Sequence, residues 1–166
     1  MSNKIWEKIN YFCGFLPLGA LFGLVAFVAN VEIQDLDLWL HLAMGKIIVQ
    51  NHYVPLVDVL SCSIKGTPWI NHEWLFQVIV YFFYQHCGAE GVLRLQAVIV
   101  TLTMFLLLLL GYNKERQLLT TFLLLLVYLV FQQRFTTRPD LFSLFFFACY
   151  MFILALHIYK KWSSVS

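Results

Sequence analysis

Long apolar runs constrain the fold of this chain more than any other feature. The runs at 11–31, 92–112 and 141–159 each approach or reach the ~20 apolar residues that a helix needs to cross a bilayer. Hydrophobic residues make up 61% of the chain and charged residues only 12%, whereas a soluble domain carries about 25% charged residues. So few charges cannot cover a water-facing surface. The sequence therefore predicts an all-α integral membrane protein.

Two further apolar runs, 74–84 and 118–131, put the expected number of transmembrane helices at four to five. The run at 118–131 is extended by neutral residues on both sides. The run at 74–84 is shorter than the ~17 residues of a minimal span, so it is either a short span or a re-entrant helix. We predict a single membrane domain over 1–166. Its parts are a first span at 11–31, a large polar outer loop at 32–73, and the remaining apolar helices at 74–159.

The ends of the first apolar run predict its orientation. Lys4 and Lys8 precede it, and no Ala-x-Ala cleavage site follows it, so we expect a retained span with a cytoplasmic N-terminus. The predicted location is the bacterial inner (cytoplasmic) membrane, with the lipid bilayer as the first partner. The net charge of +2 comes without a basic stripe, which argues against binding to nucleic acid.

The polar loop contains five of the nine acidic residues and three of the five histidines. Its first part, 35–48, has helical potential, and on a helix Asp37 and His41 share one face. We expect this helix to lie along the membrane and to present Asp37 and His41 as catalytic candidates, with Trp39 contributing to substrate binding. The alternative makes Asp35 an N-cap and Asp37 a first-turn acid that complements the helix dipole.

Two further polar patches are candidates for binding. His72 and Glu73, just before the run at 74–84, suit a divalent cation shared with Asp37, or form a polar helix cap. Arg134 and Arg138 suit the oxygens of a phosphate, because a guanidinium group matches them bidentately. The alternative for the arginines is a basic turn at the membrane boundary, with Pro139 starting the next helix.

The order of these patches resembles the N-terminal part of the GT-C class of membrane glycosyltransferases, especially the protein O-mannosyltransferase and aminoarabinose transferase superfamily. Those proteins have a first span, an acidic motif on a membrane-lying helix of the outer loop, a polar motif before the next span, and an arginine-rich turn containing an aspartate. The matching segments here are 35–45, 66–73 and 134–140. The chain departs from this pattern at two positions. Leu38 stands where many relatives have a second acid next to the first. In the polar motif, Asn71 rather than Glu73 falls where relatives often place an acidic residue.

The resemblance implies a sugar donor carried on a polyprenyl phosphate, with Asp37 as the base or as the acid that orients the acceptor. A divalent cation or an arginine would stabilise the departing phosphate, with His72 and Glu73 nearby. It also favours a spanning 74–84 segment, which makes the turn at Arg134 and Arg138 cytoplasmic. The positive-inside rule favours the opposite arrangement, with this turn on the side of the polar loop.

Full members of that class have more spans and usually a soluble domain, so two functions stay open for this chain. The first is a GT-C-like glycosyltransferase, or its N-terminal module, using a lipid-linked donor. The second is a non-catalytic membrane subunit whose loop packs within a larger complex. Transport is a weaker third function. A proton or ion relay needs ionisable residues near the middle of a span, and Arg94 is the one residue in the expected spans that approaches this position.

Overall fold

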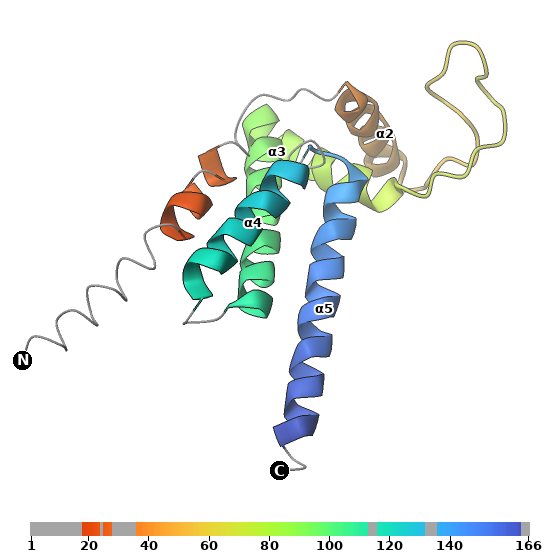
Figure 1. Cartoon of the computed structure of the whole chain (residues 1–166). Helices are drawn as coiled ribbons and strands as arrows, with labels where there is room; N and C mark the ends of the chain where they lie inside the picture. The colour runs from red at the N-terminus through yellow and green to blue at the C-terminus, as the bar shows by residue number, and fades with distance from the viewer. Residues whose placement is uncertain (1–17, 24, 28–35, 113–115, 132–135, 164–166) are drawn as a thin grey trace, which may run out of the picture.

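The computed structural model describes residues 18–23, 25–27, 36–112, 116–131 and 136–163. Within these ranges the protein is all-helical, with no strand beyond an isolated bridge between Val57 and Pro68. A short helical segment lies within Leu18–Phe27. The other helices are α2 (Asp37–Asn51), α3 (Trp74–Gly111), α4 (Gln117–Phe131) and α5 (Pro139–Ser163) (Figure 1).

Helix α3 bends sharply at Gly88. The backbone there has φ 65° and ψ −161°, a conformation that glycine adopts because it has no Cβ atom. The part before the bend is about 21 Å long and the part after it about 34 Å, at 1.5 Å per residue. In Figure 1 the second part runs beside α4, whereas the first part crosses behind the upper end of α5, close to α2.

Two hydrophobic clusters correspond to the two parts of α3. The first part packs against α2 through a cluster that contains Leu38, Leu42, Phe76 and Val80. The second part packs with the segment at 18–27, α4 and α5 in the larger cluster, which is made of the following buried residues: Leu18, Leu21, Val25, Ala97, Ile99, Val100, Met104, Leu124, Tyr128 and Leu141. Helices α4 and α5 each pack against α3. The protein thus consists of an upright helical group with α2 and the first part of α3 across one end.

Helices α3 and α5 are long and apolar enough to cross a membrane, by length and composition. Much of the apolar surface of α5 is exposed; Phe147, Tyr150 and Ile153 each keep more than 60% of their surface accessible. An apolar surface of this extent requires a cover of lipid or of another protein. Helix α4 and the first part of α3 are shorter, each about 21–23 Å, so they reach less than the ~30 Å of a hydrocarbon core.

The structure answers several expectations from the sequence. A helix does lie in the first part of the polar loop, over Asp37–Asn51 with Asp37 in its first turn, and α5 does start at Pro139. The run at 74–84 is not a separate upright helix, because it is the first, crossing part of α3. The expected first span at 11–31 falls largely outside the described residues, as does Asp35.

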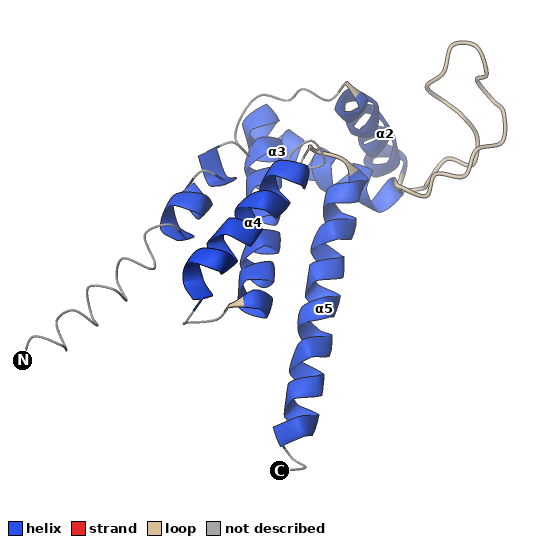
Figure 2. Ribbon diagram, in the orientation of Figure 1, coloured by secondary structure: helices blue, strands red, loops and turns tan. Residues whose placement is uncertain are grey.

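The connection between α2 and α3 is an extended loop with a turn, drawn in tan in Figure 2. Backbone hydrogen bonds pair its two arms, from Asp58 N to Thr67 O (2.9 Å) and from Trp69 N to Leu56 O (2.9 Å). Asp58 also accepts hydrogen bonds from the hydroxyl (2.6 Å) and the backbone N–H (2.8 Å) of Ser61. These bonds favour the charged carboxylate and lower the pKa of Asp58, the Ser61 hydroxyl contributing most.

Because the pKa of Asp58 is lowered in the folded loop, its carboxylate stabilises the turn above the ordinary aspartate pKa. That contribution is lost as the pH falls through the lowered value. In a carboxyl-carbon NMR titration we expect Asp58 to titrate below the usual aspartate range. The substitution Ser61→Ala should move the pKa of Asp58 up towards that range, whereas the control Ser63→Ala should leave it in place. An unchanged titration in Ser61→Ala would refute this cause.

Close packing of α2 on α3 depends on Gly45. A Cβ atom at this position would lie 2.2 Å from the backbone oxygen of Gln77 and 2.7 Å from Cβ of Tyr81. Backbone atoms cannot yield as a flexible side chain can, so Gly45→Ala should push α2 away from α3. We expect a loss of about 1–3 kcal/mol, as for other overpacked sites, seen as a lower melting temperature in detergent. At Gly111 an added Cβ meets nothing within 4 Å, so Gly111→Ala is the control; equal stability of the two variants would contradict the prediction.

Candidate functional site

Helix α2 carries the first two residues of the site one turn apart. Asp37 lies in its first turn, and its Oδ2 accepts a hydrogen bond from Nη2 of Arg138 at 3.0 Å. The ion pair is open to solvent, with 63% of the Asp37 side chain and 49% of the Arg138 side chain exposed. Pairs in such surroundings contribute about 0.2–1 kcal/mol, so this ion pair adds little to the stability of the fold.

His41 lies below Asp37 and is buried, with 6% of its surface exposed. Its ring meets that of Phe76 edge to face, with 5.1 Å between the ring centroids. Its Nδ1 lies 3.7 Å from Oε2 of Glu73. Phe76 therefore holds the imidazole in place while one ring nitrogen faces a carboxylate.

Glu73 immediately precedes α3, at its N-cap position, but its side chain makes no capping hydrogen bond. The carboxylate instead lies between two imidazoles, with Nε2 of His72 3.9 Å from Oε1. A polar cap is therefore a poor description of Glu73.

His72 itself is 82% exposed. Among the described residues, no three His, Cys, Asp or Glu side chains gather as a metal site. Bound here, a divalent cation would need further ligands from water or substrate, so the metal role of His72 and Glu73 stays a prediction.

A buried polar contact anchors the turn that carries Arg138. The hydroxyl of Thr137 donates a hydrogen bond to the side-chain oxygen of Gln96, and both residues are more than 90% buried. Backbone bonds also hold the turn, from Arg138 N to Thr136 O (2.8 Å) and from Leu141 N to Arg138 O (3.1 Å). The contact with the second part of α3 thus fixes the position of the turn and of the Arg138 backbone.

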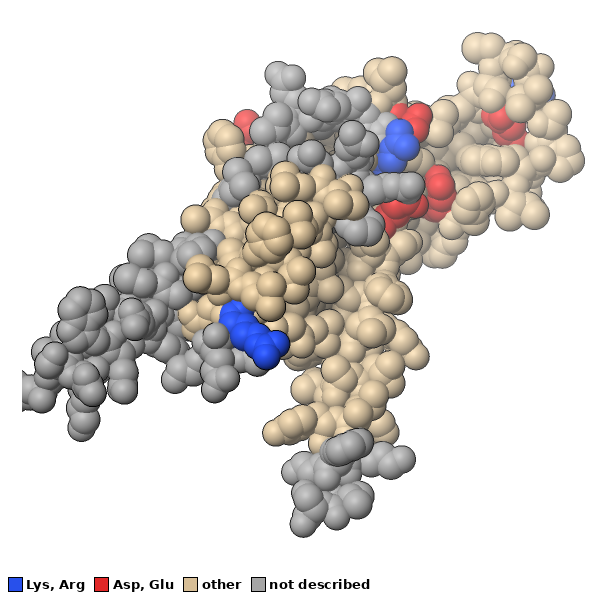
Figure 3. All heavy atoms as spheres, viewed as in Figure 1, with Lys and Arg blue, Asp and Glu red and all other residues tan. Residues whose placement is uncertain are grey.

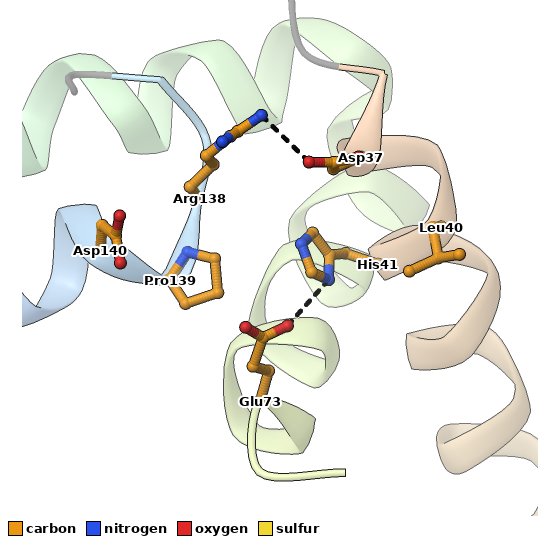
Figure 4. Close-up of a pocket in the computed structure, with 7 residues that line it drawn as sticks. All are labelled: Asp37, Leu40, His41, Glu73, Arg138, Pro139 and Asp140. Atoms are coloured by element: carbon orange, nitrogen blue, oxygen red, sulfur yellow. Dashed lines mark hydrogen bonds and ion pairs between the residues drawn. The ribbon is translucent and has the colours of Figure 1, made fainter. Parts of the chain in front are cut away.

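These elements enclose a pocket of about 310 Å³ (Figure 4). It is lined by seven residues from α2, the start of α3 and the start of α5: Asp37, Leu40, His41, Glu73, Arg138, Pro139 and Asp140. Three carboxylates, one guanidinium group and one imidazole therefore share one cavity. In Figure 3 acidic and basic residues meet beside the upper end of α5, and most of the other described residues on this face are uncharged.

The structure brings together Asp37, His41, Glu73 and Arg138 from the predicted set. Trp39 does not line the pocket; it is 51% exposed, and its ring packs against that of Tyr84 at 6.3 Å. The substrate-binding role predicted for it stays a prediction. Arg134 lies outside the described residues.

Sequence reasoning missed the supporting residues Gln96 and Thr137. The available signal was Gln96 itself, a polar side chain within an apolar run, because such a residue is costly unless it has a partner. A second buried polar pair joins two side-chain amides, with Asn71 Nδ2 donating to Gln77 Oε1 at 2.6 Å. It ties the end of the loop to the first turn of α3.

No protein-family model matches the chain, and no curated protein or solved structure is significantly similar to it. Any assignment of function therefore rests on the pocket and its surroundings.

The Thr137 anchor can be tested by removing its hydroxyl. Thr137→Val keeps the shape of the side chain and takes away a buried hydrogen bond, so it should cost about 1–3 kcal/mol. Thr136→Val changes the neighbouring, half-buried threonine, which contributes its backbone oxygen to the turn. Thermal unfolding in detergent should therefore show a loss for Thr137→Val and little change for Thr136→Val. Equal effects would mean that the hydroxyl does not anchor the turn.

Proposed function

We propose that the chain is an integral protein of the bacterial inner membrane, with its pocket on the outer side. Its support is the pair of long apolar helices and the exposed apolar surface of α5. The pocket lies where α5 begins, so the connection from α3 to α4 and the C-terminal end of α5 belong to the opposite side. Those segments contain Lys114, Arg116, Lys160 and Lys161, which the positive-inside rule places in the cytoplasm together with the N-terminus.

The contact between Asp37 and Arg138 favours one of the two topologies left open by the sequence. Asp37 from the polar loop and Arg138 from the turn before α5 are within hydrogen-bonding distance. Both therefore belong to the same side, as expected if the segment at 74–84 does not span. The first part of α3 then lies along the outer boundary of the membrane, next to α2.

For the reaction, we propose sugar transfer from a polyprenyl-phosphate donor to an acceptor hydroxyl, as in GT-C-like glycosyltransferases. The observation that carries this proposal is the meeting of three carboxylates, a buried imidazole and a guanidinium group in one pocket at the end of apolar helices. A carboxylate suits the removal of a proton from a hydroxyl. A guanidinium suits the phosphate of a donor whose lipid tail lies in the bilayer.

In the proposed mechanism Asp37 takes the proton of the acceptor hydroxyl while the hydroxyl oxygen attacks the anomeric carbon of the sugar. The bond from that carbon to the phosphate oxygen breaks, and its electron pair leaves with the polyprenyl phosphate. Arg138 stabilises the additional negative charge of the leaving group. Glu73, whose carboxylate lies 3.7 Å from the buried His41, holds the sugar or the acceptor through its oxygens.

The apolar surfaces of α4 and α5 favour a second candidate function. Phe122, Val130, Phe146 and Ile153 are each more than half exposed, and a larger membrane protein would cover them as well as lipid does. In that case the chain is a non-catalytic subunit of a membrane complex. The pocket then becomes part of an interface rather than a reaction centre.

The enzymatic proposal predicts a defined pattern of variants in proteoliposomes supplied with polyprenyl-phosphate sugars and a hydroxyl acceptor. Asp37→Asn should lower the rate of transfer by about 100-fold or more, the usual effect of losing a general base. Arg138→Gln should lower it about tenfold or more, through the loss of a charged hydrogen bond. Glu90→Gln removes an acid outside the pocket, paired with Arg94 at 2.9 Å, and should leave the rate unchanged.

Normal transfer by Asp37→Asn would exclude Asp37 as the base. If the wild-type chain transfers no sugar but is recovered from native membranes in a stable complex with a larger membrane protein, the subunit proposal replaces the enzymatic one. The quantity to measure is the sugar transferred to the acceptor.

A further inference from the structure

The ion pair between Asp37 and Arg138 joins the two groups that the proposed reaction needs apart. A carboxylate oxygen that accepts a hydrogen bond from a guanidinium is occupied by that contact, and a guanidinium occupied by a carboxylate is a weaker phosphate site. We propose that this ion pair is a latch: the phosphate of an incoming ligand takes Arg138, and Asp37 is thereby released to act as the base. The proposal rests on the function proposed above, but it concerns binding and is tested by binding.

Exposure and geometry make the exchange feasible. Both side chains are about half exposed or more, and they meet through Nη2 of Arg138 and Oδ2 of Asp37 at 3.0 Å. An exposed pair of this kind is weak. The phosphodiester of the proposed donor carries one negative charge on two non-bridging oxygens, and farnesyl phosphate, a monoester, carries more charge on three; either can accept two parallel hydrogen bonds from one guanidinium group. A phosphate can therefore replace the carboxylate at Arg138.

The backbone on both sides of the latch is held in place, so the exchange requires only side-chain rotation. On one side, the Thr137 contact with Gln96 and the bond from Leu141 N to Arg138 O fix the turn. On the other side, Leu38 follows Asp37 directly and is fully buried in the packing of α2 on α3. Arg138 and Asp37 can thus separate without moving α2 or α5.

The pocket also contains other charged groups. Glu73 lies opposite His41 and next to His72, and Asp140 lies in the first turn of α5. Asp37 is in direct contact with Arg138. A phosphate that takes Arg138 displaces this contact, so donor binding makes the base available when the donor is present.

The test compares the affinities of full-length variants in detergent for farnesyl phosphate, farnesol and inorganic phosphate. Because Asp37 competes with the phosphate for Arg138, Asp37→Asn should bind farnesyl phosphate about fivefold more tightly than the wild type, near the upper limit for an exposed pair. Arg138→Gln should bind it more weakly. Glu90→Gln makes the same change of net charge at another exposed carboxylate–guanidinium pair and should not change the affinity.

A double-mutant cycle separates the latch from simple charge repulsion. In the Arg138→Gln background, the latch predicts that Asp37→Asn has no effect, because there is no guanidinium left to compete for. An equal gain in both backgrounds would mean general repulsion and would overturn the latch. So would a gain in the affinity for farnesol, which carries no phosphate, or the absence of any gain in Asp37→Asn. Unfolding curves check that every variant is folded, and Asp37→Ser repeats the test with a second neutral residue.

The remaining comparisons identify the source of the phosphate and keep the two proposals apart. Tighter binding of farnesyl phosphate than of inorganic phosphate assigns the latch to a lipid head group, and equal affinities assign it to a free phosphate. If Asp37→Asn gains affinity but the wild type transfers no sugar, the latch stands and the enzymatic proposal fails. If the wild type transfers sugar and Asp37→Asn gains no affinity, the latch alone fails.

Discussion

The bend of α3 at Gly88 determines whether the pocket exists at all. Along a straight helix Glu73 would lie about 35 Å from Gln96, at 1.5 Å per residue. In the structure Gln96 anchors the turn of Arg138, and Arg138 lines the same pocket as Glu73. The bend therefore folds the first part of α3, together with α2, across the end of the helical group. Gly88 makes this possible because its φ of 65° and ψ of −161° cost little without a Cβ atom.

Polar pairs inside apolar surroundings then fix the parts of the site to one another. Thr137 and Gln96 join the turn before α5 to α3, and Asn71 and Gln77 join the end of the loop to the first turn of α3. A buried polar group is costly without a partner, so each pair specifies one arrangement of the elements that carry it. Close contact at Gly45 acts in the same direction by bringing α2 onto α3. The pocket is thus held by contacts that lie outside its own lining.

The interactions of the charged residues in the pocket differ in burial and in strength. The Asp37–Arg138 pair is exposed and weak, whereas His41 is buried beside Phe76 and faces Glu73. Exposed charges are available for exchange with a ligand, and the buried imidazole is a fixed part of the wall. The proposed latch depends on this difference in exposure. A purely structural role for all of these charged residues does not explain why the Asp37–Arg138 pair is exposed.

The sequence by itself determined the helical class, the helix in the first part of the polar loop and the start of α5 at Pro139. These follow from local causes, namely apolar run length, helical spacing and the geometry of proline. It also singled out Asp37, His41, Glu73 and Arg138, which line the pocket, as candidates. It did not decide that the segment at 74–84 crosses the other helices, that Trp39 turns away towards Tyr84, or that Asp37 meets Arg138. Those features depend on the bend at Gly88 and on contacts such as that of Thr137 with Gln96, 41 residues apart. Only the tertiary structure decides them, because apolar periodicity carries no information about which distant polar groups will become neighbours.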